Sequence, residues 1–173
     1  MKNESTGFTE TDLQGFLDEM IDHDRLALAD RLQRASDRLA EYAPLVTAGR
    51  GQESAMWSAH EVLAHIVVLS KFYGVIFHKV SSGKMTELDL LNNVGLRDAM
   101  DEQMAQIEPG ELIRMALEDH ARTIKGLRAA DAASMRRVVK VDRGETMTAE
   151  EVARLPLISH LELHIDQLMR ALA

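Results

Sequence analysis

The sequence of 173 residues contains no cysteine and only three prolines. The lack of cysteine excludes a disulfide scaffold, a zinc site with cysteine ligands, an iron–sulfur cluster and a cysteine nucleophile. The scarcity of proline, together with frequent Ala, Leu, Glu, Arg and Met, favours helices. The seven histidines are then the main candidates for binding a transition metal.

Positive charge is also scarce: 20 Lys and Arg stand against 28 Asp and Glu, for a net charge of −8. This balance argues against nucleic acid as the main partner and against an anionic membrane surface. The first six residues are polar and carry no secretory signal, and no stretch approaches 18 uncharged apolar residues. We therefore expect no membrane span and a cytoplasmic protein.

The length is that of one ordinary domain, so residues 1–173 are expected to form a single domain with residues 1–9 flexible. Hydrophobic spacing and start and stop signals predict four long helices. They cover 11–42, a segment from Ser58 to about 82, 109–130, and a segment from Thr148 to the C-terminus. One or two short helices are expected around 87–92 and 97–105, and an extended segment with a turn at 138–145. The predicted fold is an all-α four-helix bundle with a long, partly irregular connection between the second and third long helices.

The first helix carries an apolar stripe at three- and four-residue spacing. Its members are Leu13, Leu17, Met20, Leu28, Leu32, Ala35, Leu39 and Tyr42. Asp24 falls on this stripe. Either the helix bends or is partly hydrated there, or Asp24 points inward beside a polar group; the first interpretation is favoured because Asp is seldom buried without a partner.

The second and last long helices begin with the same signal, a capping box with a flanking hydrophobic staple. The residues are Ser58, Glu61, Trp57 and Val62 in one helix, and Thr148, Glu151, Met147 and Val152 in the other. Pro156 lies inside the last helix. A proline there either kinks the helix or begins a new one at its first turn.

Three histidines form the candidate metal site. His160 and His164 are four residues apart, so their side chains share one helix face and could bind one ion. His65, on the apolar second helix, is the candidate third ligand, although such a histidine is more often a hydrogen-bonded core residue. The combination is what favours a site, because facing helices of a bundle build metal sites in its core.

His60 does not extend this group. His60 and His65 resemble the His-Glu-x-x-His signature of zinc proteases with one residue too many, and five residues turn the two rings about 140° apart. We expect His60 to face solvent. Glu61 could accept a hydrogen bond from His65 or act as a general base, but capping the helix is the favoured role. Glu162 is expected to be solvated, and His23, His78 and His120 to be surface or core residues.

Two motifs together resemble the DinB-like family of metal-binding four-helix bundles, whose relatives include thiol-dependent transferases and the mycothiol-dependent maleylpyruvate isomerase. These motifs are Trp57-Ser58-x-x-Glu61-Val62-Leu63-Ala64-His65-Ile66 and His160-x-x-x-His164-x-x-Gln167-Leu168. The resemblance spans nearly the whole chain and implies that His65, His160 and His164 are the metal ligands. The isomerase branch has a carboxylate at the first position of the final pair, so His160 is typical of the three-histidine branch. Pro156 departs from the family pattern.

Three neutral histidines on one divalent ion leave positions open for water or substrate. Zinc and nickel suit imidazole best, and iron and manganese are also compatible. The resemblance implies an enzyme that activates a low-molecular-weight thiol for transfer to, or isomerisation of, a small-molecule substrate. It also implies a homodimer.

Three other functions fit the same residues. One is a metal-dependent hydrolase on the same site. Another is a stress-response protein that binds metal or a small ligand without catalysis. The last is a helical interaction module in which the histidines only pack.

Overall fold

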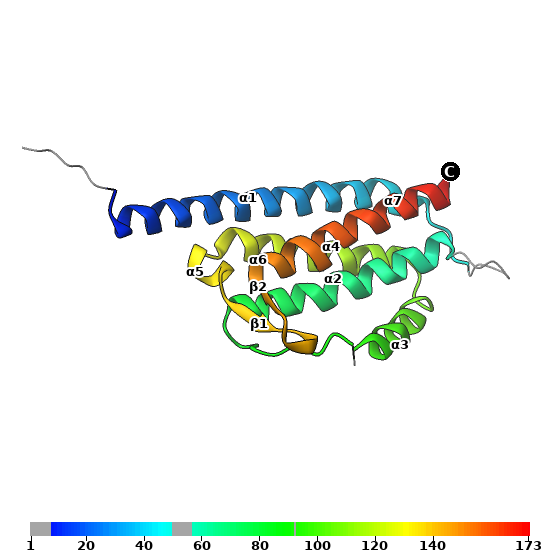
Figure 1. Cartoon of the computed structure of the whole chain (residues 1–173). Coiled ribbons are helices and arrows are strands. Elements are labelled where there is room, and N and C mark those ends of the chain that lie inside the picture. The colour runs from blue at the N-terminus through cyan, green and yellow to red at the C-terminus, as the bar shows by residue number, and fades with distance from the viewer. Residues whose placement is uncertain (1–7, 50–56, 92) are drawn as a thin grey trace, which may run out of the picture.

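A computed structural model describes residues 8–49, 57–91 and 93–173, and its long helical segments form a four-helix bundle (Figure 1). The segments are α1 (Glu10–Tyr42), α2 (Ala59–Ser81), α4 (Pro109–Ala129), and a last segment in which α6 (Ala149–Val152), a π-helical turn (Ala153–Ser159) and α7 (His160–Leu172) follow without a break. The prediction of an all-α bundle is confirmed. α2 packs on both α4 and α7, and α1 packs on α4 and α7 from the other side.

The connection between α2 and α4 is irregular, as expected, and in its described residues one of the two candidate short helices forms. α3 (Val94–Met104) corresponds to the prediction at 97–105. The prediction at 87–92 is wrong for Glu87–Leu91, and Asn92 lies outside the described residues. Glu87 pairs with Lys140 in a parallel β-bridge, and the Leu88 N–H donates to the Lys140 carbonyl at 2.8 Å. Pairing with a distant strand overrides the local helical pattern.

The strand involved belongs to a small hairpin that follows α5 (Ala132–Met135). β1 (Val138–Lys140) pairs antiparallel with β2 (Thr146–Thr148), which confirms the extended segment predicted from its β-branched residues. Arg143 and Gly144 adopt positive φ angles of 64° and 81° in the turn. The hairpin leads directly into the capping box of α6, where the Thr148 hydroxyl accepts from the Glu151 N–H.

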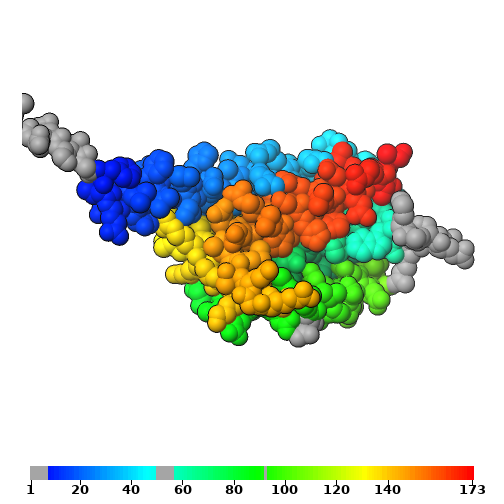
Figure 2. Space-filling view, in the orientation of Figure 1, coloured from blue at the N-terminus to red at the C-terminus, as the bar shows by residue number. Residues whose placement is uncertain are grey.

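The stripe along α1 is buried only in its second half. Leu28, Leu32 and Leu39 are fully buried, whereas Leu13, Leu17 and Met20 are 45%, 41% and 51% exposed. The prediction of a core role for the earlier residues is therefore wrong. α1 has 33 residues and α2 only 23, so α1 extends about 15 Å beyond it at 1.5 Å per residue. Figures 1 and 2 show this end of α1 protruding past the bundle.

The ends of α1 are close to those predicted. The helix begins after the Thr9 N-cap, whose hydroxyl accepts from the Asp12 N–H. Residues 1–7 lie outside the described residues. Asp24 is half exposed, with a carboxylate oxygen 3.6 Å from the Arg154 guanidinium, in agreement with the hydrated interpretation.

α2 is the most apolar of the long helices and supplies much of the core. By length and composition alone it could cross a membrane, which the search for uncharged runs in the sequence missed. However, 67% of its apolar window is buried inside the structure, as is usual for the core helix of a bundle.

A polar triad crosses this core. His120 of α4 bonds through Nε2 to the Ser70 hydroxyl of α2 at 2.8 Å and through Nδ1 to the Ser36 hydroxyl of α1 at 3.1 Å. Both ring nitrogens are thus satisfied, and the imidazole is 1% exposed. Burial lowers the pKa of His120 from 6.5 to about 4. The neutral ring therefore ties three helices together.

Gly74 lets α2 and α4 approach closely. A Cβ atom at this position would lie 2.9 Å from the Thr123 hydroxyl, which is buried and donates to the Asp119 carbonyl. That separation is shorter than any comfortable van der Waals contact, so either the helices or Thr123 would have to move.

Replacing Gly74 with alanine should lower the free energy of unfolding by about 1–2 kcal/mol, because overpacking outweighs the better helix propensity of alanine. Gly15→Ala is the matched control, since nothing lies within 4 Å of a Cβ there. It should raise stability by up to about 1 kcal/mol. Urea denaturation measures the change in unfolding free energy for each variant. If both variants change stability in the same direction, the close approach of α2 and α4 at Gly74 is contradicted.

Acid should destabilise the metal-free protein partly through His120. The unfolded chain takes up a proton on this residue near pH 6.5 and the folded protein only near pH 4, so stability is lost as the pH falls between these values. The slope from one such group is at most about 1.4 kcal/mol per pH unit. Urea denaturation from pH 7 to pH 4.5 should show a shallower fall for His120→Gln than for the original chain. If the free energy of unfolding falls with pH equally in the two proteins, His120 has the same pKa in the folded and unfolded chain.

Candidate metal centre

Three histidines converge between α2 and α7. His65 comes from α2, and His160 and His164 from successive turns of α7; one ring nitrogen of each lies within 4.8 Å of the others. The ring centroids are 4.5 Å apart for His65 and His164 and 4.6 Å apart for His160 and His164. All three side chains are half-buried. The structure thus brings together the three residues singled out in the sequence, in a group that could hold a metal ion.

The start of α2 sets the position of His65. The Ser58 hydroxyl accepts from the Glu61 N–H at 3.2 Å, and the Glu61 carboxylate accepts from the Ser58 N–H at 2.7 Å. This is the predicted capping box, so the capping role of Glu61 is confirmed. His65 follows one turn after Glu61, on the same helix face.

The π-helical turn around Pro156 sets the position of the other two histidines. Pro156 neither ends the helix nor restarts it; the His160 N–H reaches back five residues to the Leu155 carbonyl. The Ser159 hydroxyl donates to the Arg154 carbonyl at 2.8 Å. The turn leads directly into His160, so it sets where the histidine pair of α7 begins.

Neighbouring acceptors fix the protonation of two of the three rings. His65 Nδ1 lies 2.8 Å from the Asp101 carboxylate and His164 Nδ1 lies 2.9 Å from the Gln167 side-chain oxygen. Both acceptors require Nδ1 to carry the proton, which leaves the lone pair on Nε2. In the described part of the chain, His164 Nε2 is buried and has no hydrogen-bond partner. A buried imidazole nitrogen with a free lone pair is what a divalent metal requires, so the residues fit a metal ion.

Two of the three histidines, His160 and His164, have lowered pKa values. Burial, aided by the nearby His164, His65 and Arg97, lowers the pKa of His160 to about 4. Burial also lowers the pKa of His164. At neutral pH both rings are therefore in the uncharged form that binds metal.

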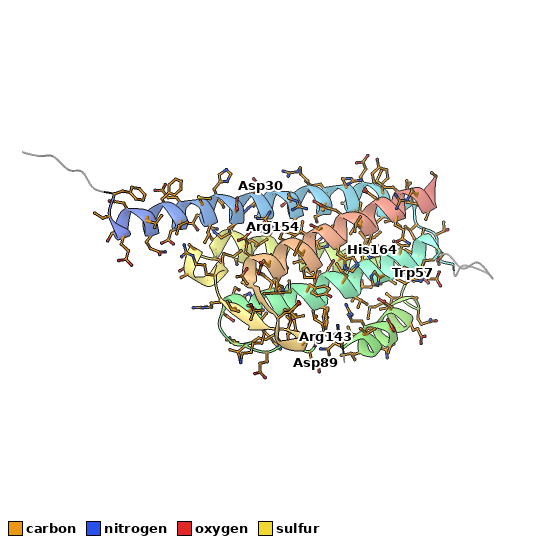
Figure 3. The ribbon with its side chains drawn as sticks, viewed as in Figure 1. Asp30, Trp57, Asp89, Arg143, Arg154 and His164 are labelled. Carbon is orange, nitrogen blue, oxygen red and sulfur yellow. The ribbon has the colours of Figure 1, made fainter. Side chains whose placement is uncertain are left out.

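Trp57 and Asp101 are parts of the site that the sequence did not reveal. Trp57 was expected only as a hydrophobic staple, but its ring centroid lies 4.8 Å from that of His65 and 6.3 Å from that of His164 (Figure 3). Trp57 lies four residues before Glu61 and eight before His65, a spacing that corresponds to one face of a helix and could have indicated the contact. Asp101 lies on α3, 36 residues after His65, so no local pattern could link them.

A pocket of about 250 Å³ opens beside His65, between the start of α2 and α3. Its lining is acidic, and consists of Trp57, Glu61, His65, Asp98, Asp101, Glu102 and Ala105. A pocket lined by carboxylates attracts cations and repels multiply charged anions.

Arg97 brings positive charge to the side of His160, whose pKa it helps to lower. It donates to the Tyr73 hydroxyl at 2.8 Å and lies over the Phe72 ring. Within the described residues its Nε–H is buried without a partner.

Two expectations about neighbouring residues are wrong. His60 is 6% exposed rather than solvent-facing: its Nε2–H donates to the Ile107 carbonyl at 2.8 Å, and its Nδ1 accepts from the Gly49 N–H. Glu162 is not simply solvated, because it forms an ion pair with Arg31 of α1 at 2.6 Å. In both cases the partner comes from a segment distant in sequence. His60 lies outside the group of three, as its spacing predicted.

No family model and no curated protein matches the chain. Two solved structures do: the mycothiol-dependent maleylpyruvate isomerase and a histidine-to-alanine variant of it, each with a TM-score of 0.67 and 17% sequence identity. Each match covers 85% of this chain and 60% of the other, so the chain spans about 60% of the length of these neighbours. The likeness shows that the fold is shared.

Removing the acceptor on His65 should weaken metal binding. Asp101→Ala leaves the His65 ring free to rotate and to change tautomer, so zinc affinity should fall about 10- to 100-fold. Competition with a chromophoric chelator measures this. Asp98→Ala, which removes an exposed carboxylate from the same pocket, should change affinity far less. Equal losses would mean that total charge, not orientation of the ring, sets the affinity.

Proposed function

We propose that the chain is a metal-dependent enzyme of the DinB-like type, which uses His65, His160 and His164 to hold a divalent ion and acts with a low-molecular-weight thiol on a small-molecule substrate. One observation carries the proposal: three imidazoles meet, acceptors on Nδ1 orient the rings of His65 and His164, and the buried Nε2 of His164 has no partner among the described residues. Rings that merely packed in a core would have both nitrogens satisfied, as His120 does.

The donor set favours zinc or nickel, with iron or manganese also compatible. When bound, such an ion lowers the pKa of a coordinated water or thiol and so supplies the reactive anion. The chain supplies the rest: Asp101 and Gln167 hold the ring protons away from the centre, and Trp57 shields two of the rings from water.

If the chemistry uses a thiol, that thiol must be a bound cosubstrate, since the chain has no cysteine. The shared fold with a mycothiol-dependent enzyme supports the use of a thiol. The acidic pocket favours a substrate that is neutral or cationic in the part that contacts the carboxylates. Near His160, the Arg97 guanidinium can pair with one anionic group of the substrate.

Metal content tests the site. Protein purified without an affinity tag should contain about one divalent ion per chain by mass spectrometry, and His160→Ala should contain almost none. His23→Ala is the matched control, because His23 lies exposed on α1. Full metal content in His160→Ala, or none in the original chain, would contradict the three-histidine site.

Thiol dependence tests the chemistry. The metal-loaded protein is assayed with electrophilic substrates and mycothiol, glutathione or cysteine, against a control with water alone. The consumption of thiol should depend on the protein and disappear in His160→Ala. A rate indifferent to added thiol would instead support a hydrolase, and bound metal without turnover would support a binding protein.

A further inference from the structure

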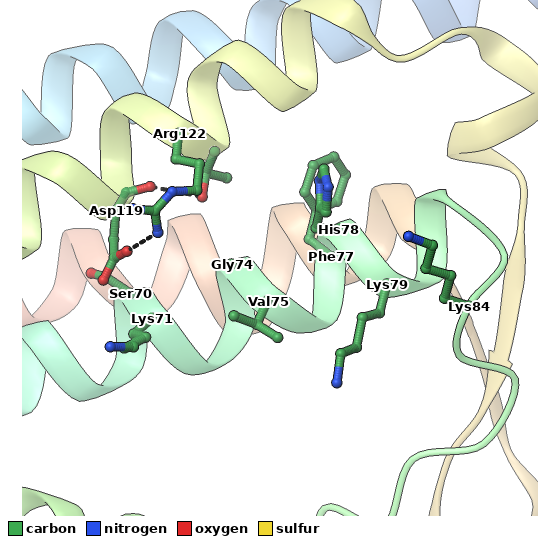
Figure 4. Close-up of a pocket in the computed structure, with 11 residues that line it drawn as sticks. Ser70, Lys71, Gly74, Val75, Phe77, His78, Lys79, Lys84, Asp119 and Arg122 are labelled. Atoms are coloured by element: carbon green, nitrogen blue, oxygen red, sulfur yellow. Dashed lines mark hydrogen bonds and ion pairs between the residues drawn. The ribbon is translucent and has the colours of Figure 1, made fainter.

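A second pocket lies between α2 and α4 (Figure 4). It is on the side of α2 opposite His65. Gly74 lines it and is nine residues after His65, which places the two positions about 180° apart around the helix and about 13 Å apart along it. The pocket has a volume of about 260 Å³. It is thus separate from the candidate metal centre.

The lining combines an apolar wall with a cationic rim. Gly74, Val75 and Phe77 contribute the wall. The rim is formed by Lys71, Lys79, Lys84 and Arg122, with Asp119 as its one carboxylate, and His78 also lines the pocket. Figure 4 shows the lysines spread along α2 and the segment after it, with Asp119 and Arg122 on α4.

The one carboxylate of the rim is already engaged. Asp119 pairs with Arg122 at 2.6 Å. Within the described ranges, Lys71, Lys79 and Lys84 have no ion-pair partner. The positive charge of the rim is therefore available to a ligand.

This gathering of charge stands out against the composition. The chain has a net charge of −8 and only six lysines, and three of the six line this pocket. Lysines that serve only for solubility would be spread over the surface among acidic neighbours. Concentrated around a concave apolar wall, they form a surface complementary to an anion.

We propose that this pocket binds a small organic acid with an apolar, aromatic body. The carboxylate pairs with the lysines, and the body lies against Val75 and Phe77. A volume of about 260 Å³ admits one or two aromatic rings. Inorganic phosphate would leave the apolar wall uncovered, and an extended polyanion would meet the acidic surface beyond the rim.

Binding of 2-naphthoate tests the proposal, with 2-naphthalenemethanol as the uncharged counterpart. Calorimetry on the full chain should show that 2-naphthoate binds at least about tenfold more tightly than the alcohol. Added salt should lower the affinity for 2-naphthoate and leave the affinity for the alcohol unchanged. Lys79→Gln and Lys84→Gln should each weaken binding of the acid by about tenfold, since each removes a charge-assisted hydrogen bond. Val75→Glu, an exposed position in the wall, should abolish it.

Two variants control for general effects. Lys125→Gln removes a lysine from the exposed surface of α4 outside the pocket and should leave binding unchanged. His160→Ala should also bind 2-naphthoate normally, so failure here is distinguishable from failure of the proposed metal chemistry. Circular dichroism confirms that each variant is folded.

The proposal would be overturned by equal affinity for acid and alcohol, or by unchanged affinity in both lysine variants. Displacement of 2-naphthoate by inorganic phosphate at the same affinity as the acid itself would show that only charge is recognised. Loss of binding in His160→Ala would place the acid at the metal centre instead.

Discussion

The packing of α2 between α4 and α7 positions both the candidate metal centre and the second pocket. α2 presents His65 toward α7, where the histidine pair completes the candidate metal centre, and Gly74 toward α4, where the second pocket opens. The close approach at Gly74 holds one side of the helix, and buried apolar contacts hold the other. Because a packed core is rigid, a shift of α2 would disturb both sites together.

The histidines of this chain show how the same side chain serves different purposes. His60 and His120 use both ring nitrogens in hydrogen bonds and hold distant segments together. His164 is bonded only through Nδ1 among the described residues, and its Nε2 is buried with no partner. The number of satisfied ring nitrogens, rather than burial, separates a structural histidine from a candidate ligand.

Local patterns predicted much of this structure because local physics determines much of it. The capping boxes at Ser58 and Thr148 were correct, since they depend only on residues three apart. The β-branched hairpin and the bundle also followed from pattern. The three-histidine group could be anticipated because helical spacing and the family resemblance pointed to the same residues.

What could not be predicted depends on the lengths and positions of distant elements. The exposure of Leu13 and Leu17 follows from α2 being shorter than α1, and the ion pair of Glu162 follows from the packing of α7 on α1. Asp101 reaches His65 because α3 packs against the start of α2, 36 residues away in sequence. Each depends on tertiary geometry that no window of sequence contains.

The π-helical turn also affects how the chain compares with others. Its hydrogen bonds reach back five residues instead of four, so the turn holds one residue more than an α-helix would. A protein with an unbroken helix would need one residue fewer between Thr148 and His160 to present the same face. An alignment without a gap at this point would pair each histidine with the neighbour of its true counterpart. The bulge at Pro156 can thus hide a shared site from a search based on fixed spacing, even where the folded chains superimpose.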